Sequence, residues 1–393
     1  MRYPTLDHID VKDKTVFVRV DYNVSLTHEG DIRDDSRIRA SLLTLIELQK
    51  KGAKLVLASH LGHPVEGSHE MSLLPVGKKL AELLKTEVIV PDDCIGMAVK
   101  KLVSEMRSGG VILLENLRFH AEEKSCEENF SEKLASLADI YVNDAFGTMH
   151  RKHASTFGMV KYFETKAIGR LVEREVKALS RLLTEPERPF AVVLGGAKIS
   201  DKIVVIESLL KKANQILIGG GMAYTFLKTQ GVRVGRSLVE DTKVSLAKRI
   251  LEKAKVKGVE VFLPVDSVIA EDFSAEAKHR VLKTSEDWGN GMALDLGPET
   301  VALYREILFQ AKTVFWNGPM GVYEFPAFQK GTQDIAEAIV QAQGFSVIGG
   351  GDSLAAIRKS GVADKISHLS TGGGASLKFL EGDELPGLRV LRA

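Results

Sequence analysis

The sequence is poor in cysteine: among its 393 residues there are only two, Cys94 and Cys126. A disulfide framework needs several paired cysteines, and a zinc site built on thiols needs more of them or a tight CxxC spacing. We therefore expect neither. The histidine pairs of HLGH (60–63) and HRKH (150–153) lie among arginines and outside a helical HExxH context, so we expect no catalytic zinc there.

Long apolar segments and an excess of one charge are also missing. No uninterrupted apolar run approaches the roughly 20 residues that span a bilayer, and the first residues, MRYPTLDHIDVKDK, have no apolar signal core. The 53 Lys+Arg and 52 Asp+Glu residues leave a formal net charge of +1. This balance excludes a globally basic nucleic-acid coat and an acidic solvating chain. We expect a soluble, cytoplasmic protein that binds neither nucleic acid nor membrane.

Aromatic residues make up only 6% of the chain, whereas there are 35 glycines, which favours a helix-and-parallel-sheet enzyme over an all-β sandwich. Short β-branched runs alternate with helical patterns such as SRIRASLLTLIELQKKG. The runs are continuously apolar, as expected for parallel strands buried on both faces. They begin at Thr15, Lys54, Val111, Ile140, Phe190, Gln215, Val259, Thr313, Phe345 and Ile366. This alternation predicts doubly wound α/β architecture.

The sequence predicts a domain boundary near Glu185. Residues 168–184 form an amphipathic helical pattern, which the prolines Pro186 and Pro189 end. A stiff helix before a proline-marked break suits a connector between two domains. It also suits an ordinary helix end, and the pattern alone leaves both interpretations open.

The strand ends of the first half carry cationic and hydrogen-bonding side chains. In an open α/β sheet ligands bind beyond the carboxyl ends of the strands. The residues there are Asp21, Asn23, His60, His63, Arg118, His120, His150 and Arg151, and Arg37 opens the next helix. Because guanidinium groups match carboxylate and phosphate geometry, this set predicts a pocket for a small molecule with several negative charges. The alternative is a set of scattered surface charges.

The strand ends of the second half carry glycine. The runs are Gly195–Gly196, Gly219–Gly221, Gly318, Gly349–Gly351 and Gly372–Gly374. Each is expected to open into a helix whose free N–H groups attract phosphate, which indicates a nucleotide site. Tight turns would explain any single run. No GxxxxGK[ST], GxGxxG, HRD or DFG motif is present, so neither a Walker-type site, the usual dinucleotide fingerprint nor a protein kinase is indicated.

Charged residues close to these glycines could serve phosphate chemistry. Lys198 and Lys202 stand four apart where we expect a helix to begin, so both could face one ligand and neutralise charge during transfer. Asp352 follows a glycine run directly. It could hold a magnesium ion on nucleotide phosphates or serve as a helix N-cap.

Taken together, these segments resemble the phosphoglycerate kinase family along the whole chain. The family pattern RVDxNV is present at 19–24, with SHLGRP at 59–64 in the form SHLGHP, ENxRFH at 115–120 and NDAFGTxHR at 143–151. GGAKxSDK lies at 195–202, GGGxAxTF at 219–226, WNGPxGVxE at 316–324, GGGD[ST] at 349–353 and STGGGAS at 370–376. So many long motifs in order are far more specific than one glycine loop.

The resemblance implies a two-lobed monomer that transfers phosphoryl between 1,3-bisphosphoglycerate and ADP, in line, in a cleft closed by hinge bending. It implies a phosphoglycerate-binding domain at 1–170 with a returning tail at about 380–393, an interdomain helix at 171–186 and a Mg-nucleotide domain at 187–379. It places the substrate on Asp21, Asn23, Arg37, His60, His63, Arg118 and Arg151. It places the nucleotide on Gly196, Lys202, Gly220, Asn317, Glu324, Gly350, Gly351, Asp352, Ser353 and Gly373, with Mg²⁺ on Asp352. Arg37, Lys198 and Lys202 are the expected catalytic residues.

The sequence departs from the family pattern at three positions. His63 stands where the family usually has arginine, so we expect weaker substrate binding unless His63 is protonated. Ser25 replaces a usual proline, and Met149 replaces a commonly smaller residue. Two rival functions remain: a nicotinamide dehydrogenase, which shares the fold class, and a non-catalytic binding protein for anionic metabolites. The second would need the first-half arginines but not Lys198, Lys202 or Asp352.

Overall fold

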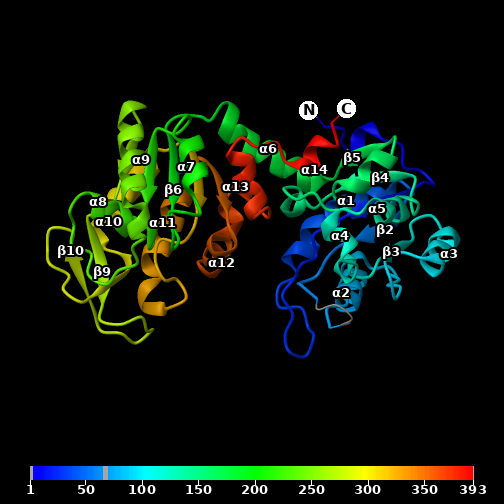
Figure 1. Cartoon of the computed structure of the whole chain (residues 1–393), viewed down its shortest axis with the longest axis horizontal. Helices are drawn as coiled ribbons and strands as arrows, with labels where there is room; N and C mark the ends of the chain where they lie inside the picture. Colours follow the sequence, from blue (N-terminus) through cyan, green and yellow to red (C-terminus); the bar gives the residue numbers. More distant parts are fainter. Residues whose placement is uncertain (1–2, 65–69, 393) are drawn as a thin grey trace. The chain divides into compact units, whose positions relative to one another are not determined.

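The computed structural model describes residues 3–64 and 70–392. The chain forms two compact units, unit 1 from Met1–Lys177 with Glu384–Ala393 and unit 2 from Ala178–Asp383. Residues 1–2, 65–69 and 393 of the expected first domain lie outside the described part. In Figure 1 the C-terminal helix α14 (Pro386–Arg389), drawn in red, lies in the segment of unit 1 that follows unit 2 in the sequence.

Unit 1 is built on a five-stranded, all-parallel sheet with the strand order β3-β2-β1-β4-β5. The order changes direction at β1 and β4, so the crevice beyond their carboxyl ends is where a ligand site is expected. The strands are β1 (Thr15–Arg19), β2 (Lys54–Ala58), β3 (Val111–Leu113), β4 (Ile140–Asn143) and β5 (Lys166–Ile168). All but β5 were predicted.

Helices cover the sheet of unit 1 because alternate strand residues are apolar on both faces. Val16 and Val18 of β1 pack in one cluster with Ile38, Leu45 and Leu48 of α1, whereas Phe17 points the other way and stacks on Tyr141 at 6.0 Å between ring centroids. The helices are α1 (Ser36–Lys50), α2 (Leu74–Leu84), α3 (Met97–Glu105), α4 (Glu122–Ser125) and α5 (Glu128–Ala135). Short 3₁₀ turns are η1 (Leu6–His8), η2 (Leu117–Phe119), η3 (Phe146–Thr148) and η4 (Gly158–Tyr162).

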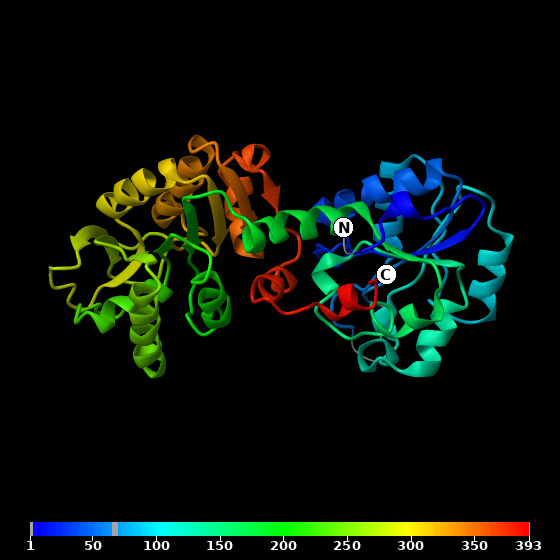
Figure 2. The same cartoon turned by 90° about the horizontal axis from the view of Figure 1, so that it is seen from above.

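Unit 2 is built on a six-stranded parallel sheet with the order β14-β13-β12-β6-β7-β8. Its strands are β6 (Phe190–Leu194), β7 (Gln215–Ile218), β8 (Glu260–Phe262), β12 (Thr313–Asn317), β13 (Phe345–Gly349) and β14 (His368–Leu369). The helices α10 (Pro298–Gln310), α11 (Lys330–Gln341) and α12 (Gly351–Lys359) pack on one face, and Figure 2 shows helices on both sides of this sheet. Further helices are α7 (Ile203–Leu209), α8 (Met222–Thr229), α9 (Val244–Val256) and α13 (Gly374–Leu380). The 3₁₀ turns are η5 (Asp241–Lys243), η6 (Pro326–Phe328) and η7 (Ala363–Lys365).

A three-stranded antiparallel sheet, β10-β9-β11, was not predicted. It comprises β9 (Asp266–Ala270), β10 (His279–Lys283) and β11 (Met292–Leu296). The polar sequence HRVLK of β10 is mostly exposed, so it lacks the continuous apolar run by which the other strands were predicted. The doubly wound α/β architecture expected for both lobes is confirmed.

The boundary between the units falls inside α6 (Arg170–Thr184), between Lys177 and Ala178. The predicted helix began at Ile168, which is wrong by two residues, because Ile168 pairs with Asn143 as the last residue of β5. The helix ends at Thr184, before Pro186, as predicted. Among the helices described over 3–64 and 70–392, none is both long and apolar enough to cross a membrane.

Candidate functional site

The polar strand ends of unit 1 converge at the carboxyl edge of its sheet. Asp21 and Asn23 follow β1, His60 and His63 follow β2, Arg118 lies in η2 after β3, and Arg151 follows η3 after β4. Arg37 is the second residue of α1. Since the strands are parallel, every one of these loops leaves the sheet on the same edge.

Direct contacts tie several of these side chains together. Arg37 forms an ion pair with Asp21. The Asn23 side-chain oxygen accepts a hydrogen bond from the Gly62 N–H at 2.7 Å. Nη1 of Arg118 lies 3.3 Å from Nδ1 of the exposed His63 and also donates to the Gly62 carbonyl. These contacts, with the hydrogen bond from the Asn23 N–H to Asp21 at 3.4 Å, connect five of the seven residues predicted for substrate binding. His60 instead contacts Arg19, and Arg151 contacts His150.

The pKa of His60 shows that this group of residues is strongly cationic. Its side chain is buried, and burial lowers its imidazole pKa far below 6.5. The positive charges of four arginines lower that pKa further: Arg19, Arg118, Arg151 and Arg37. His60 is consequently neutral at pH 7, and the arginines present an excess of positive charge that suits a multiply anionic ligand.

Arg19 was missing from the predicted site, although it stands at the end of β1. The Arg19 residue is only 1% exposed. Its Nε donates a hydrogen bond to the Ser155 hydroxyl at 2.8 Å, and its Nη2 lies 3.1 Å from Nδ1 of His60. The same Ser155 hydroxyl donates to the buried carboxyl of Glu123 at 2.6 Å. An arginine at the end of an otherwise apolar buried strand was the sequence signal that could have identified it.

Unit 2 contains a cavity of about 690 Å³ at the carboxyl edge of its sheet. Glycine backbone forms one part of its wall and apolar side chains form another. It is lined by Gly196, Ala197, Gly220, Gly221, Tyr224, Arg236, Leu238, Phe273, Met292, Ala293, Leu294, Pro319, Gly321, Val322, Glu324, Phe325 and Asp352. Gly196, Gly220, Glu324 and Asp352 of the predicted nucleotide set thus line a single cavity.

The glycine loops of this cavity pack backbone against backbone. Gly220 has φ +62°, and a Cβ there would lie 2.6 Å from the amide nitrogen of Gly196, so no larger residue fits without displacing that loop. The side chain of Asn317 at the end of β12 accepts from Lys202 Nζ and donates to the Gly349 carbonyl at 2.7 Å. These contacts fix the loops after β6, β12 and β13 relative to one another.

Two details at the helix starts of unit 2 differ from the prediction. Lys198 and Lys202 do not share a helix, because 197–202 is a turn and α7 begins only at Ile203. Lys198 is exposed, whereas burial lowers the pKa of Lys202 against the charges of Asp201 and Asp352. Asp352 is not the N-cap of α12 either, because Gly350 holds that position.

Not every glycine run opens directly into a helix. Those at 219–221, 349–351 and 372–374 do, and they precede α8, α12 and α13. Gly318 instead enters the turn that leads to η6. Ser353 of the predicted nucleotide set is buried and accepts a hydrogen bond from the Gly318 N–H at 2.6 Å. Gly351 and Gly373 lie at the starts of α12 and α13, outside the cavity lining.

Comparison with known proteins gives one consistent answer. The phosphoglycerate kinase family model matches residues 6–383. The chain belongs to the phosphoglycerate kinase family. Phosphoglycerate kinases of Anaeromyxobacter dehalogenans (strain 2CP-C) and Clostridium botulinum (strain Kyoto / Type A2) are each 50% identical to it, over 99% and 98% of both chains respectively.

Solved structures of the phosphoglycerate kinase family share the fold. Phosphoglycerate kinase from Coxiella burnetii superposes with a TM-score of 0.91 at 39% identity, covering 99% of this chain and 98% of that one. The enzyme from Pyrococcus horikoshii OT3 gives a TM-score of 0.84 at 36% identity, with the same coverage.

Membership of the phosphoglycerate kinase family establishes the activity. The chain is a phosphotransferase of glycolysis that interconverts 1,3-bisphosphoglycerate plus ADP with 3-phosphoglycerate plus ATP. This result confirms the kinase predicted from the motifs and sets aside both the nicotinamide dehydrogenase and the non-catalytic binding protein.

Proposed function

We propose that the cationic edge of unit 1 binds phosphoglycerate and that the glycine-lined cavity of unit 2 binds the magnesium nucleotide. The observation that carries the first assignment is the group of four arginine charges around the buried, neutral His60. A bisphosphorylated or carboxylated three-carbon substrate brings the negative charge that this group lacks. The Arg37–Asp21 ion pair holds one partly exposed guanidinium beside the end of β1.

In unit 1, Arg118, Arg151 and His63 are placed to receive the phosphate, with Asp21, Asn23 and His60 around the glycerate. Arg118 is suited to this role because its Nε is buried without a hydrogen-bond partner, so a donor is already desolvated there. Arg118 also lowers the pKa of His63 below 6.5, so His63 is neutral at pH 7 until an anion is bound beside it. The contact with His63 is therefore weaker than one with a permanent guanidinium.

In unit 2, the apolar part of the cavity suits the nucleotide base and the glycine loops suit its phosphates. We assign Gly196, Gly220, Glu324 and Asp352 to this site from the cavity lining. Lys202 and Asn317, with the loop after β13 that Asn317 contacts, add Gly350, Gly351 and Ser353. Gly373, the N-cap of α13 after β14, completes the proposed set. The exposed Asp352 carboxylate fits Mg²⁺, which proteins commonly hold through one or two carboxylates plus substrate phosphates. When bound, Mg²⁺ would neutralise phosphate charge.

Catalysis in this scheme depends on positioning and charge. The nucleophile in the direction from ATP is the carboxylate of 3-phosphoglycerate, which is ionised at pH 7 because its ordinary pKa is roughly 4, so no general base is needed. Arg37 and Lys198, with Lys202, stabilise the phosphoryl group during direct in-line transfer. We infer that hinge bending brings the two substrates together and excludes water, which prevents hydrolysis.

We further propose that the enzyme works as a cytoplasmic monomer.

The decisive experiment is MgATP-dependent phosphorylation of 3-phosphoglycerate, coupled to NADH oxidation by glyceraldehyde-3-phosphate dehydrogenase. Arg37→Ala and Lys198→Ala are each expected to lose at least about 100-fold in kcat, as is typical when one charge-stabilising donor is removed. Matched controls are Arg39→Ala on the same helix, where Arg39 pairs with Asp35, and Lys211→Ala in unit 2. Near-wild-type kcat in the Arg37 or Lys198 variant would overturn that residue's catalytic role.

A further inference from the structure

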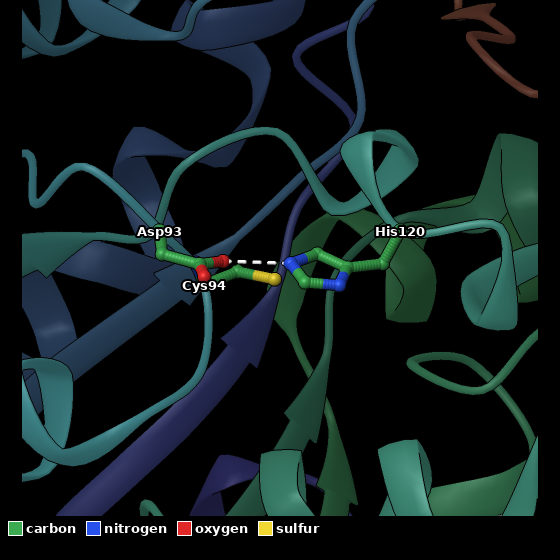
Figure 3. Close-up of side chains that lie close together, drawn as sticks. All are labelled: Asp93, Cys94 and His120. Carbon is green, nitrogen blue, oxygen red and sulfur yellow. Dashed lines mark hydrogen bonds and ion pairs between the residues drawn. The ribbon is translucent and has the colours of Figure 1, made fainter. Parts of the chain in front are cut away.

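Asp93, Cys94 and His120 form a cluster in unit 1 that no step of the kinase reaction uses. Asp93 and Cys94 lie in the segment before α3, and His120 follows η2. One carboxylate oxygen, the thiol sulfur and one ring nitrogen of these residues all lie within 4.8 Å of one another. Figure 3 shows the three side chains meeting from two separate segments.

Hydrogen bonds and packing already hold this cluster in place. Nε2 of His120 and Oδ1 of Asp93 are 2.7 Å apart and share a proton. The same oxygen accepts from the Cys94 N–H at 2.6 Å, and the His120 ring packs on Phe130 at 5.2 Å between ring centroids. Three potential ligands are therefore positioned before any ion is bound, which lowers the cost of ordering them.

The surroundings of the cluster favour a cation with an affinity for sulfur. Cys94 is 1% exposed, while the side chains of Asp93 and His120 are 50% and 25% exposed, so the thiol is inside and water reaches the other two ligands. A carboxylate oxygen of Asp93 lies within 4.8 Å of the thiol sulfur, so a cation there meets a negative charge as well as sulfur. A mixed sulfur, nitrogen and oxygen donor set suits zinc, whereas Mg²⁺ and Ca²⁺ prefer oxygen alone.

We propose that Asp93, Cys94 and His120 bind one zinc ion, with water as the fourth ligand. The ion replaces the proton shared by Nε2 of His120 and Oδ1 of Asp93, and it displaces the thiol proton of Cys94. The imidazole keeps its other proton on Nδ1. Zinc bonds of about 2.3 Å to sulfur and about 2.0–2.2 Å to nitrogen and oxygen fit within the span of the three atoms.

Sequence analysis did not predict this site because its three ligands are not arranged in a zinc motif. Cys94 and His120 are separated by α3 and β3, and only folding brings the two segments together. A bound ion would join the segment before α3 to the end of η2. Because the folded chain alone presents all three ligands together, zinc should also stabilise unit 1 against unfolding.

The first test is a titration of the full-length, EDTA-treated protein with Co²⁺ as a spectroscopic probe of the zinc site. We expect one equivalent to produce intense visible bands of tetrahedral cobalt and a thiolate-to-cobalt charge-transfer band in the near ultraviolet, both abolished by added Zn²⁺. Weak octahedral bands without charge transfer would overturn the proposal, as would no binding.

Variants then assign the ligands. Cys94→Ser and His120→Gln should each weaken Co²⁺ binding by at least about 10- to 100-fold, the loss that removal of even an outer partner causes. Cys126→Ser removes the other thiol and should leave the spectrum and affinity unchanged. A charge-transfer band that disappears in Cys126→Ser, or that survives in Cys94→Ser, would refute the assignment. If Cys94→Ser fails to fold by circular dichroism, the more exposed His120→Gln decides the matter.

Discussion

Asp144 offers a sharp test of the electrostatics inside unit 1. It follows β4 and lies fully buried beneath the first turn of α6. Its Oδ1 accepts hydrogen bonds from the N–H groups of Leu171 at 2.9 Å and Val172 at 3.3 Å, which caps the helix. Gly169 allows this close approach, because a Cβ there would lie 2.2 Å from the same oxygen.

Burial raises the pKa of Asp144 from 3.8 to about 6, although hydrogen bonds from Thr44, Val172 and Leu171 act in the opposite direction. The unfolded chain therefore releases this proton at a lower pH than the folded chain does. Folding favours the protonated carboxyl, so stability falls as the pH rises from 3.8 to about 6 and is level above that range. At about 1.4 kcal/mol per pH unit, the full loss is about 3 kcal/mol.

Asp144→Asn should remove this pH dependence, because an amide stays neutral and its oxygen can still accept from the helix. The free energy of unfolding of the variant minus that of the wild type should rise by about 2 kcal/mol between about pH 4.5 and pH 7.5. The measurement is urea unfolding followed by far-ultraviolet circular dichroism at several pH values. Both tryptophans, Trp288 and Trp316, lie in unit 2, so their fluorescence follows that unit separately in the same samples.

The comparison between pH values removes any constant effect of the substitution itself. A difference that stays the same from about pH 4.5 to about pH 7.5 would refute the reasoning, because it would mean that the pKa of Asp144 is the same in both states. A difference that shrinks as the pH rises would mean that the folded protein favours the ionised carboxylate, as the two helix N–H donors alone would dictate.

Three further predictions concern the buried Arg19 and the proposed substrate and metal contacts. Arg19→Met should lower the free energy of unfolding by about 3–5 kcal/mol, because it removes one of the two positive charges, those of Arg19 and Arg118, that act on the buried carboxyl of Glu123; coincident urea transitions for variant and wild type would contradict this. His63→Arg should lower KM for 3-phosphoglycerate by about tenfold near pH 7.5, through a charge-assisted contact. That advantage should shrink as the pH falls below 6.5 and His63 becomes protonated, and an equal KM at every pH would count against the contact. Asp352→Asn should raise the Mg²⁺ concentration needed for half-maximal activity by about tenfold, with Asp364→Asn as the exposed control; an unchanged Mg²⁺ requirement would remove Asp352 from the metal site.

The parallel sheets could be predicted from sequence because burial on both faces produces continuous apolar runs, as in FAVVL of β6. The antiparallel sheet could not, because β10 is exposed over most of its length and carries no such run. The start of α6 was placed too early for a similar reason. Ile168 is as buried and apolar as the helix stripe it precedes, and only pairing with β4 assigns it to a strand.

In the candidate site too, the sequence predicted what depends on neighbouring residues and missed what depends on contacts between distant parts of the chain. Residues directly after a strand, such as Asp21 and His60, could be placed because a parallel sheet brings its strand ends to one edge. The local placement of Lys202 and Asp352 could not be predicted, because it depends on where the turn before α7 ends and on which residue caps α12.

Arg19 shows most clearly what could not be predicted from the sequence. Its position at the end of a buried strand was visible, but its role depends on Ser155 and His60, which folding brings to it from distant parts of the chain. Cys94 and His120 likewise lie far apart in the sequence, and only folding brings their side chains together. Sequence spacing excludes a site only when its ligands must come from one segment. In an α/β sheet they come from several strand ends, so the loops beyond those ends must be compared with one another before a site is excluded.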